Sequence, residues 1–176
     1  MSTLWQPITW VIFHSLTKNF DERYKEHYII FFNSFKTIIP CRICRNHFIE
    51  NTSKNDLKIE ENINQESIFN WTINLHNSVN KLNHKKEWSY EQARNYYNSH
   101  PLNNNILKIF ILEYIKSNFK KNPEKTQALF TMLRSLGYLH PEEEKRKKLI
   151  DFKERFELNH DTIRSWLLAF LIILKS

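Results

Sequence analysis

The chain has very little glycine, one residue in 176, beside five prolines. Glycine supplies the positive φ angles of tight hairpin turns and lets the backbone approach a bound phosphate closely. Its scarcity argues against a β-barrel, a Rossmann dinucleotide-binding motif and a P-loop. The aromatic content of 14% is too high for a disordered chain. We therefore expect a folded protein, long enough to bury a core.

Cysteine and long apolar runs are also scarce. Both cysteines, Cys41 and Cys44, lie in a single C-x-x-C motif, whereas a secreted disulfide scaffold needs more. The N-terminus has no basic region followed by an apolar stretch, so no signal peptide is expected. The longest apolar run, residues 166–174, is far shorter than the ~20 residues that span a bilayer. These absences predict a soluble intracellular protein without a membrane partner.

The net charge of +7 is carried mostly by the second part of the chain. Residues 1–100 contain twelve Lys and Arg against ten Asp and Glu, and residues 101–176 contain fourteen against nine. Because both signs are mixed in the second part, we expect a solvated surface there and no nucleic-acid partner.

Apolar side chains recur at helical spacing through most of the first hundred residues. Pro7 suits the first turn of one helix, Pro40 stops the next, and Ser89 begins a capping-box pattern. The polar segment 51–61 is predicted to be a loop. The predicted helices hold Trp10 to Thr17, residues 24–39, a short segment that starts at Cys41, residues 65–83 and residues 90–97.

A boundary is expected near Pro101, which an asparagine run follows. The sequence thus predicts two domains, residues 1–100 and residues 101–176. Gly137 is a plausible helix C-cap and Asp161 a plausible N-cap for the last helix. That last helix is apolar on all sides and is therefore expected to be buried in the second domain or in an interface. The further predicted helices are residues 106–119, residues 126–136, a charged helix after Pro141, and the helix that holds residues 166–174.

The C-x-x-C motif is the clearest candidate for chemistry. Cys41 stands where a helix should begin, and a helix N-terminus stabilises a thiolate. The spacing places both sulfurs on one helical face, close enough to bond, so a redox-active dithiol is one interpretation. Half of a metal site is another, with His47 as a third ligand and His14 or His76 closing it. Two small buried side chains without a chemical role are the third.

Two further groups of residues carry planar or polar side chains at helical spacing. Trp10 and His14 lie one turn apart on the first predicted helix, where a histidine is most often a satisfied core residue. His76 and Asn80 share one face of the fourth, which suits either a large planar phosphate-bearing ligand or an amphipathic helix with a wet side.

Taken together, these motifs resemble the Erv/ALR family of FAD-linked sulfhydryl oxidases. The order is W-x-x-x-H at Trp10 and His14, then P-C-x-x-C at residues 40–44, then W-x-x-x-x-H-N-x-V-N from Trp71 to Asn80. The resemblance covers roughly residues 4–97. With its helical extension and lack of further cysteines, the chain is most similar to members encoded by large DNA viruses.

The resemblance implies an all-α fold, with a four-helix bundle and a short fifth helix, followed here by a second all-helical domain. It implies a thiol oxidase that forms disulfides in protein substrates and reduces O2 to hydrogen peroxide, with FAD as cofactor and no metal. Cys41 would accept electrons from substrate thiols, and Cys44 would lie beside the flavin. A homodimer in the cytoplasm of an infected host cell, or in the virion, is also implied. The other FAD-binding residues implied are Trp10, His14, His76, Asn77, Val79, Asn80, Lys81, Lys85 and Trp88.

The chain departs from the family pattern at a few positions. Gln6 replaces a glycine that usually precedes the first-helix tryptophan, and Asn83 stands where leucine is usual. The cysteines of the family's structural disulfide and of a shuttle dithiol are absent. Two alternatives therefore stay open: a zinc-stabilised interaction module, and an inactive family member with a structural or nucleic-acid-binding role.

Overall fold

The computed structural model describes residues 4–175, and every regular element among them is a helix, which confirms the all-α prediction. Ten are α-helices and two are 3₁₀ turns. In chain order they are α1 (Trp5–Lys18), η1 (Glu22–Tyr24), α2 (Lys25–Ile38), α3 (Arg42–Thr52), η2 (Asn55–Leu57), α4 (Ile59–Asn62), α5 (Ile68–Leu82), α6 (Tyr90–Ser99), α7 (Asn104–Asn118), α8 (Pro123–Leu136), α9 (Glu143–Arg155) and α10 (Ile163–Lys175).

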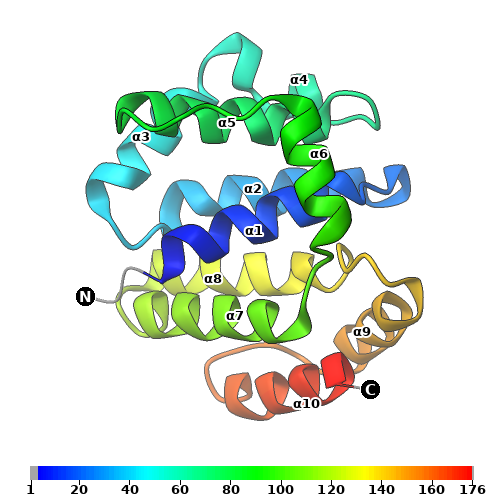
Figure 1. The fold of residues 1–176 in the computed structure, drawn as a ribbon. Coiled ribbons are helices and arrows are strands. Elements are labelled where there is room, and N and C mark those ends of the chain that lie inside the picture. Colours follow the sequence, from blue (N-terminus) through cyan, green and yellow to red (C-terminus); the bar gives the residue numbers. More distant parts are fainter. Residues whose placement is uncertain (1–3, 176) are drawn as a thin grey trace.

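The helices form three layers (Figure 1). Helices α1 and α2 make the middle layer, α3, α4 and α5 lie on one side of it, and α7 and α8 lie on the other. Helix α6 descends from the α5 layer, and α9 and α10 sit beneath α7 and α8. The middle layer therefore has protein on both sides, and its phenylalanines, including Phe13 and Phe35, are almost completely buried.

Helices from both parts of the chain share this core. The rings of Phe110 and Tyr114 on α7 lie 6.2 Å and 5.3 Å from the ring of Phe35 on α2. One continuous cluster of buried side chains runs from α1 and α2 into α7, α8, α9 and α10. The two segments pack against each other over a common core. That residues 1–100 and residues 101–176 are separate domains therefore stays a prediction.

Several helix ends follow from local sequence. The Ser89 hydroxyl accepts a hydrogen bond from the Gln92 N–H, and the Gln92 side chain accepts one from the Ser89 N–H, so the predicted capping box is present. Cys41 caps α3, since its Sγ accepts a hydrogen bond from the Cys44 N–H. None of the helices within residues 4–175 is long and apolar enough to cross a lipid bilayer.

Two of three further local predictions are wrong. The segment 51–61 is not a plain loop but contains η2 and most of α4, because Leu57 and Ile59 are buried. Gly137 is the C-cap of α8, as predicted, although its right-handed φ of −60° makes no use of glycine's conformational freedom. Asn159, rather than Asp161, accepts the backbone N–H bonds just before α10.

The last helix is buried on one side only. Trp166, Phe170 and Leu174 are almost completely buried in the shared core, whereas Leu168 and Ile172 are 64% and 60% exposed. The expected burial of this helix is therefore met on one side, and its other side is exposed. An apolar residue type does not decide which side of a helix faces its neighbours.

Candidate active site at the Cys41–Cys44 disulfide

The two cysteines form a disulfide at the N-terminus of α3, with their Cα atoms 5.2 Å apart. Both residues are half-buried, so the bond lies within reach of solvent. The Arg45 guanidinium donates a hydrogen bond to the Ile39 carbonyl at 3.0 Å, which ties the first turn of α3 to the segment before it. A thiolate formed here would be stabilised by the helix N-terminus. The geometry suits a redox-active pair.

A cavity of about 170 Å³ opens beside Cys44, between α1, α3 and α5. Its lining is mostly apolar and aromatic. Gln6 reaches across it, and its Nε2 donates a hydrogen bond to the Cys44 sulfur at 3.4 Å. The lining residues are Trp5, Gln6, Thr9, Trp10, Phe13, Ile39, Ile43, Cys44, His47, Phe48, Leu75, Val79, Leu82 and Asn83.

An aromatic stack links α1 to α5 at this cavity. The ring of Trp10, which lines it, lies parallel to the ring of His76 at 4.2 Å. Behind Trp10, the His14 Nε2 and His76 Nδ1 atoms are 3.0 Å apart and share a hydrogen bond. The ring of Tyr97 on α6 lies 4.9 Å from that of His14. Four rings from three helices thus form one aromatic cluster, and Trp10 is its member that lines the cavity.

Both histidines of this aromatic cluster are neutral at physiological pH. Burial lowers the pKa of His14 to about 3, and the neighbouring His76 contributes to the shift. Burial also lowers the pKa of His76 to about 4, with a further contribution from Lys85. One neutral ring must donate and the other accept in the shared bond. The His14 Nδ1 atom is buried and has no hydrogen-bond partner among the described residues.

Two further residues of the α5 motif, Asn77 and Asn80, bond to the segment that follows α5. Asn77 clamps the chain after α5, because its amide donates to the Trp88 carbonyl at 2.8 Å and accepts from the Trp88 N–H at 2.9 Å. Asn80 is buried, and its carbonyl accepts from the Lys85 N–H. The clamp holds the segment after α5 against the helix.

A second hollow continues the first along α3 and α5. The two share His47 and Leu82 in their linings. The second is also lined by Lys54 and Lys81, with Glu50 beside them, so charged side chains gather at this end. The combined groove is apolar and aromatic beside Cys44 and more polar away from it.

The structure thus brings together some of the predicted site residues and not others. Trp10, Cys44 and Val79 line the cavity, and Lys81 lines the second hollow. The remaining predicted residues do not line either of these two hollows: His14, His76, Asn77, Asn80, Lys85 and Trp88.

Sequence reasoning missed several lining residues. Trp5 precedes Thr9 by four positions and Thr9 precedes Phe13 by four, so the helical spacing on α1 would have placed all three on one face. Tyr97 carried no such signal, because α6 meets His14 only through the tertiary fold.

The geometry does not favour the zinc alternative. Both sulfurs are engaged in the disulfide, and within residues 4–175 no three His, Cys, Asp or Glu side chains lie close enough to hold a metal ion. His14 and His76, the suggested closing ligands, bond to each other.

A helical fold with a C-x-x-C disulfide beside an aromatic cavity defines a class of dithiol redox proteins. A sequence profile of the Erv1/Alr family matches residues 7–98. The chain belongs to this family, as its motifs predicted.

Similar proteins come from large DNA viruses. The chain is 31% identical over 93 residues to a probable FAD-linked sulfhydryl oxidase of Acanthamoeba polyphaga mimivirus, which covers 51% of this chain and 65% of that protein. It is 33% identical over 121 residues to the FAD-linked sulfhydryl oxidase of the Pig/Kenya isolate of African swine fever virus, covering 65% and 92%. The Tick/Malawi isolate's protein is 32% identical over the same length, with the same coverage. No solved structure matches the chain.

Proposed function

We propose that the protein is an FAD-linked thiol oxidase that forms disulfides in protein substrates and reduces O2 to hydrogen peroxide. The observation that carries the proposal is the Cys41–Cys44 disulfide, with Cys44 in the wall of an aromatic cavity. Membership of the Erv1/Alr family and the names of the viral relatives support it.

The residues around the cavity fit a flavin. Trp10 and Val79 offer flat and apolar surface for a planar ring, and Cys44 stands at its edge. Lys81 in the continuing hollow, with the exposed Lys85 nearby in sequence, suits phosphate groups. His14 and His76 would support the ring wall from behind, while Asn77 and Asn80 would hold α5 and the Trp88 segment in place.

The protein's own part of the reaction is thiol–disulfide exchange. A substrate thiolate attacks the sulfur of Cys41, the Cys41–Cys44 bond breaks, and Cys44 leaves as a thiolate. The second substrate thiol then displaces Cys41, so that the substrate is oxidised by two electrons and the pair is reduced. When bound beside Cys44, FAD supplies the redox chemistry that carries these two electrons and two protons to O2.

One contact favours Cys44 as the leaving group, because the Gln6 amide donates a hydrogen bond to the Cys44 sulfur. The N–H at the start of α3 donates to the Cys41 sulfur instead, so the helix N-terminus does not distinguish Cys44. His14 and His76 are neutral, so the two rings behind Trp10 add no positive charge that would stabilise a thiolate.

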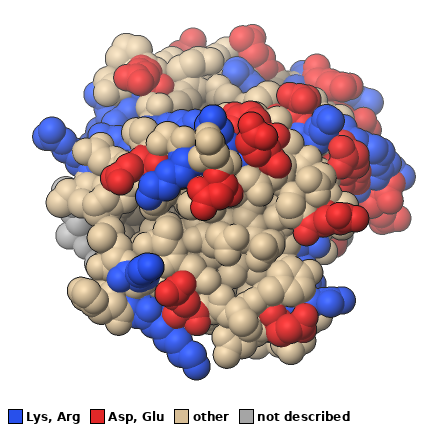
Figure 2. Space-filling model, turned by 90° about the horizontal axis from the view of Figure 1, so that it is seen from above, with Lys and Arg blue, Asp and Glu red and all other residues tan. Residues whose placement is uncertain are grey.

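The partners follow from the same proposal. Thiol-containing proteins and O2 are the substrates. We further propose that the protein is a homodimer. Because the relatives are viral, we propose that it acts in the cytoplasm of an infected host cell or in the virion. We propose no nucleic-acid partner. On the face seen in Figure 2, acidic and basic side chains are interspersed around an uncharged area.

The test is the visible spectrum of the purified protein, followed by oxygen uptake with dithiothreitol. Flavin bands at about one FAD per chain, with catalytic oxygen consumption, are expected. A protein that stays colourless after incubation with FAD would overturn the proposal. A flavin-bearing protein that consumes no oxygen would identify an inactive family member.

A further inference from the structure

We propose that Asn118, at the end of α7 and outside the family match, is a positioning residue for the reactive disulfide. In this proposal the C-terminal helices hold the segment that leads into Cys41 through this side chain. The inference rests on the proposed thiol chemistry and assigns a part in it to residues 101–176.

The Asn118 side chain is completely buried and makes two defined hydrogen bonds. Its Nδ2 donates to the Ile38 carbonyl at 2.9 Å and to the Tyr114 carbonyl at 3.0 Å. Its Oδ1 has no hydrogen-bond partner within the part of the chain that the structure describes. Because both neighbouring groups are acceptors, only this orientation of the amide satisfies them.

The Ile38 carbonyl lies at the end of α2, just before the connection to the reactive cysteines. Ile38 is the last residue of α2, and the final carbonyls of a helix have no partner within it. Two residues later comes Pro40, which has no N–H, and then Cys41, which caps α3. This short connection is held by two side chains: Arg45 on the Ile39 carbonyl and Asn118 on the Ile38 carbonyl. The Asn118 bond is thus an anchor three residues from the reactive sulfur.

The same helix also contacts the opposite wall of the cavity. The Tyr114 hydroxyl lies 2.9 Å from the Thr9 hydroxyl, both residues are buried, and Thr9 lines the cavity beside Cys44. Figure 1 shows α7 running beneath α1. Helix α7 therefore contacts both α1 and the α2–α3 connection, the two segments whose separation sets the position of the disulfide relative to the cavity.

The expected consequence of losing this anchor is a change in the dithiol–disulfide equilibrium. A disulfide forms readily when the two thiols are held in position, because their effective concentration is high. A looser connection before Cys41 lowers that concentration and favours the dithiol. The shift should reach at most about tenfold, the range of one buried hydrogen bond.

The experiment measures the Cys41–Cys44 equilibrium against glutathione buffers, using alkylation and mass spectrometry on the full-length protein. Asn118→Leu removes both donors and keeps the number and branching of the side-chain heavy atoms. The matched control is Asn104→Leu on the same helix. Asn104 donates to the Leu174 carbonyl at 3.0 Å, at the end of α7 that does not meet the cysteines. Melting temperatures are recorded for both variants.

We expect Asn118→Leu to shift the equilibrium several-fold toward the dithiol, and Asn104→Leu to leave it within about twofold while lowering the melting temperature. If Asn118→Leu does not fold, Asn118→Ser decides the matter. Its short hydroxyl can bond the Tyr114 carbonyl one turn back but does not reach Ile38.

Two results separate this inference from the proposed function. A folded Asn118 variant with a wild-type equilibrium would overturn the positioning role and leave the oxidase proposal intact. A wild-type protein whose cysteines stay reduced in oxidising glutathione buffers would overturn both. The measurement requires neither flavin nor turnover.

Discussion

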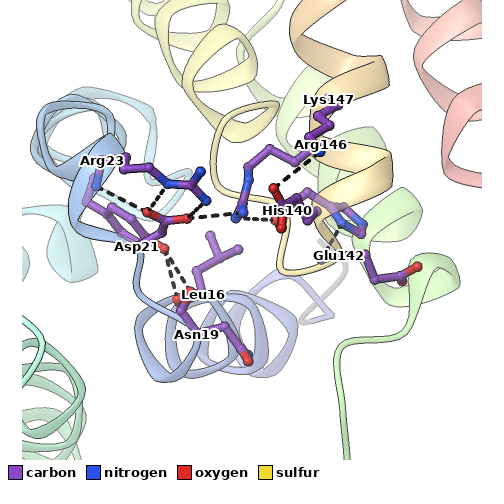
Figure 3. Close-up of polar contacts among 10 residues, drawn as sticks. Leu16, Asn19, Asp21, Arg23, His140, Glu142, Arg146 and Lys147 are labelled. Carbon is purple, nitrogen blue, oxygen red and sulfur yellow. Dashed lines mark hydrogen bonds and ion pairs between the residues drawn. The ribbon is translucent and has the colours of Figure 1, made fainter.

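The ion pair that joins the two parts of the chain gives a quantitative test of the packing. Asp21, in the connection between α1 and α2, accepts two hydrogen bonds from the Arg23 guanidinium, at 2.9 Å and 2.7 Å (Figure 3). The same carboxylate lies 3.1 Å from the Arg146 guanidinium of α9. The Arg146 side chain is only 7% exposed, donates to the His140 carbonyl and lies over the Tyr24 ring. Among residues 4–175, the buried Arg146 cation is therefore paired with one carboxylate, that of Asp21.

The two ends of this pair should respond unequally to substitution. Asp21→Asn leaves the buried Arg146 without a counter-charge, which costs about 3–5 kcal/mol of unfolding free energy. Arg146→Met removes the buried charge itself and leaves Asp21 paired with the solvent-exposed Arg23. That change should cost about 1–2 kcal/mol, mainly from the lost hydrogen bond to the His140 carbonyl. We therefore predict that the unfolding free energy of Asp21→Asn is about 2 kcal/mol lower than that of Arg146→Met.

Urea unfolding of both variants, followed by circular dichroism, measures the difference. The Arg23 side chain, and secondarily Arg146, hold the pKa of Asp21 below its usual value. The stabilisation by the carboxylate is therefore present above its ordinary pKa near 4 and lost as the pH falls through the lower folded value. The gap between wild type and Asp21→Asn should narrow below about pH 4. An Asp21→Asn variant no less stable than Arg146→Met would refute the argument.

Three further predictions concern the site and the last helix. Cys41→Ser and Cys44→Ser should each abolish oxygen uptake with dithiothreitol, and only Cys41→Ser should show a long-wavelength band from the Cys44 thiolate beside the flavin. A band that appears in Cys44→Ser instead would reverse the two roles. Because the pKa values of His14 and His76 are lowered to about 3 and about 4, stability should fall below pH 6.5 by about 1.4 kcal/mol per pH unit for each histidine. Urea midpoints between pH 7 and pH 5 measure this, and a His14→Gln variant with an unchanged slope would contradict it. Truncation after His160 removes α10 and uncovers apolar surface on its neighbours, so aggregation is expected in light scattering. A soluble remainder with an unchanged melting temperature would show that the helix is dispensable.

The helical class and several helix ends could be predicted because they depend on residues within about four positions of each other. The capping box at Ser89 and the placement of Cys41 at the start of α3 are contacts of this kind. The prediction of a loop around η2 was wrong because the structure of this segment depends on residues far away in the sequence. Leu57 is buried, and its carbonyl accepts a hydrogen bond from the Trp71 indole, fourteen residues away.

The candidate site divides in the same way. The motifs identified Trp10, Cys44 and Val79, which do line one cavity. They did not show that His14 and His76 share a hydrogen bond, because those rings are 62 residues apart in sequence.

By itself, then, the sequence determined that the chain is helical, that its two cysteines lie at a helix start, and which family it belongs to. These follow from local periodicity and from motifs whose spacing is short. Only the tertiary structure decided that α7 and α8 pack against α1 and α2, and that Asn118 bonds the Ile38 carbonyl 80 residues away. The physical reason is that such a contact depends on how whole helices are placed, and many buried apolar side chains set that placement jointly.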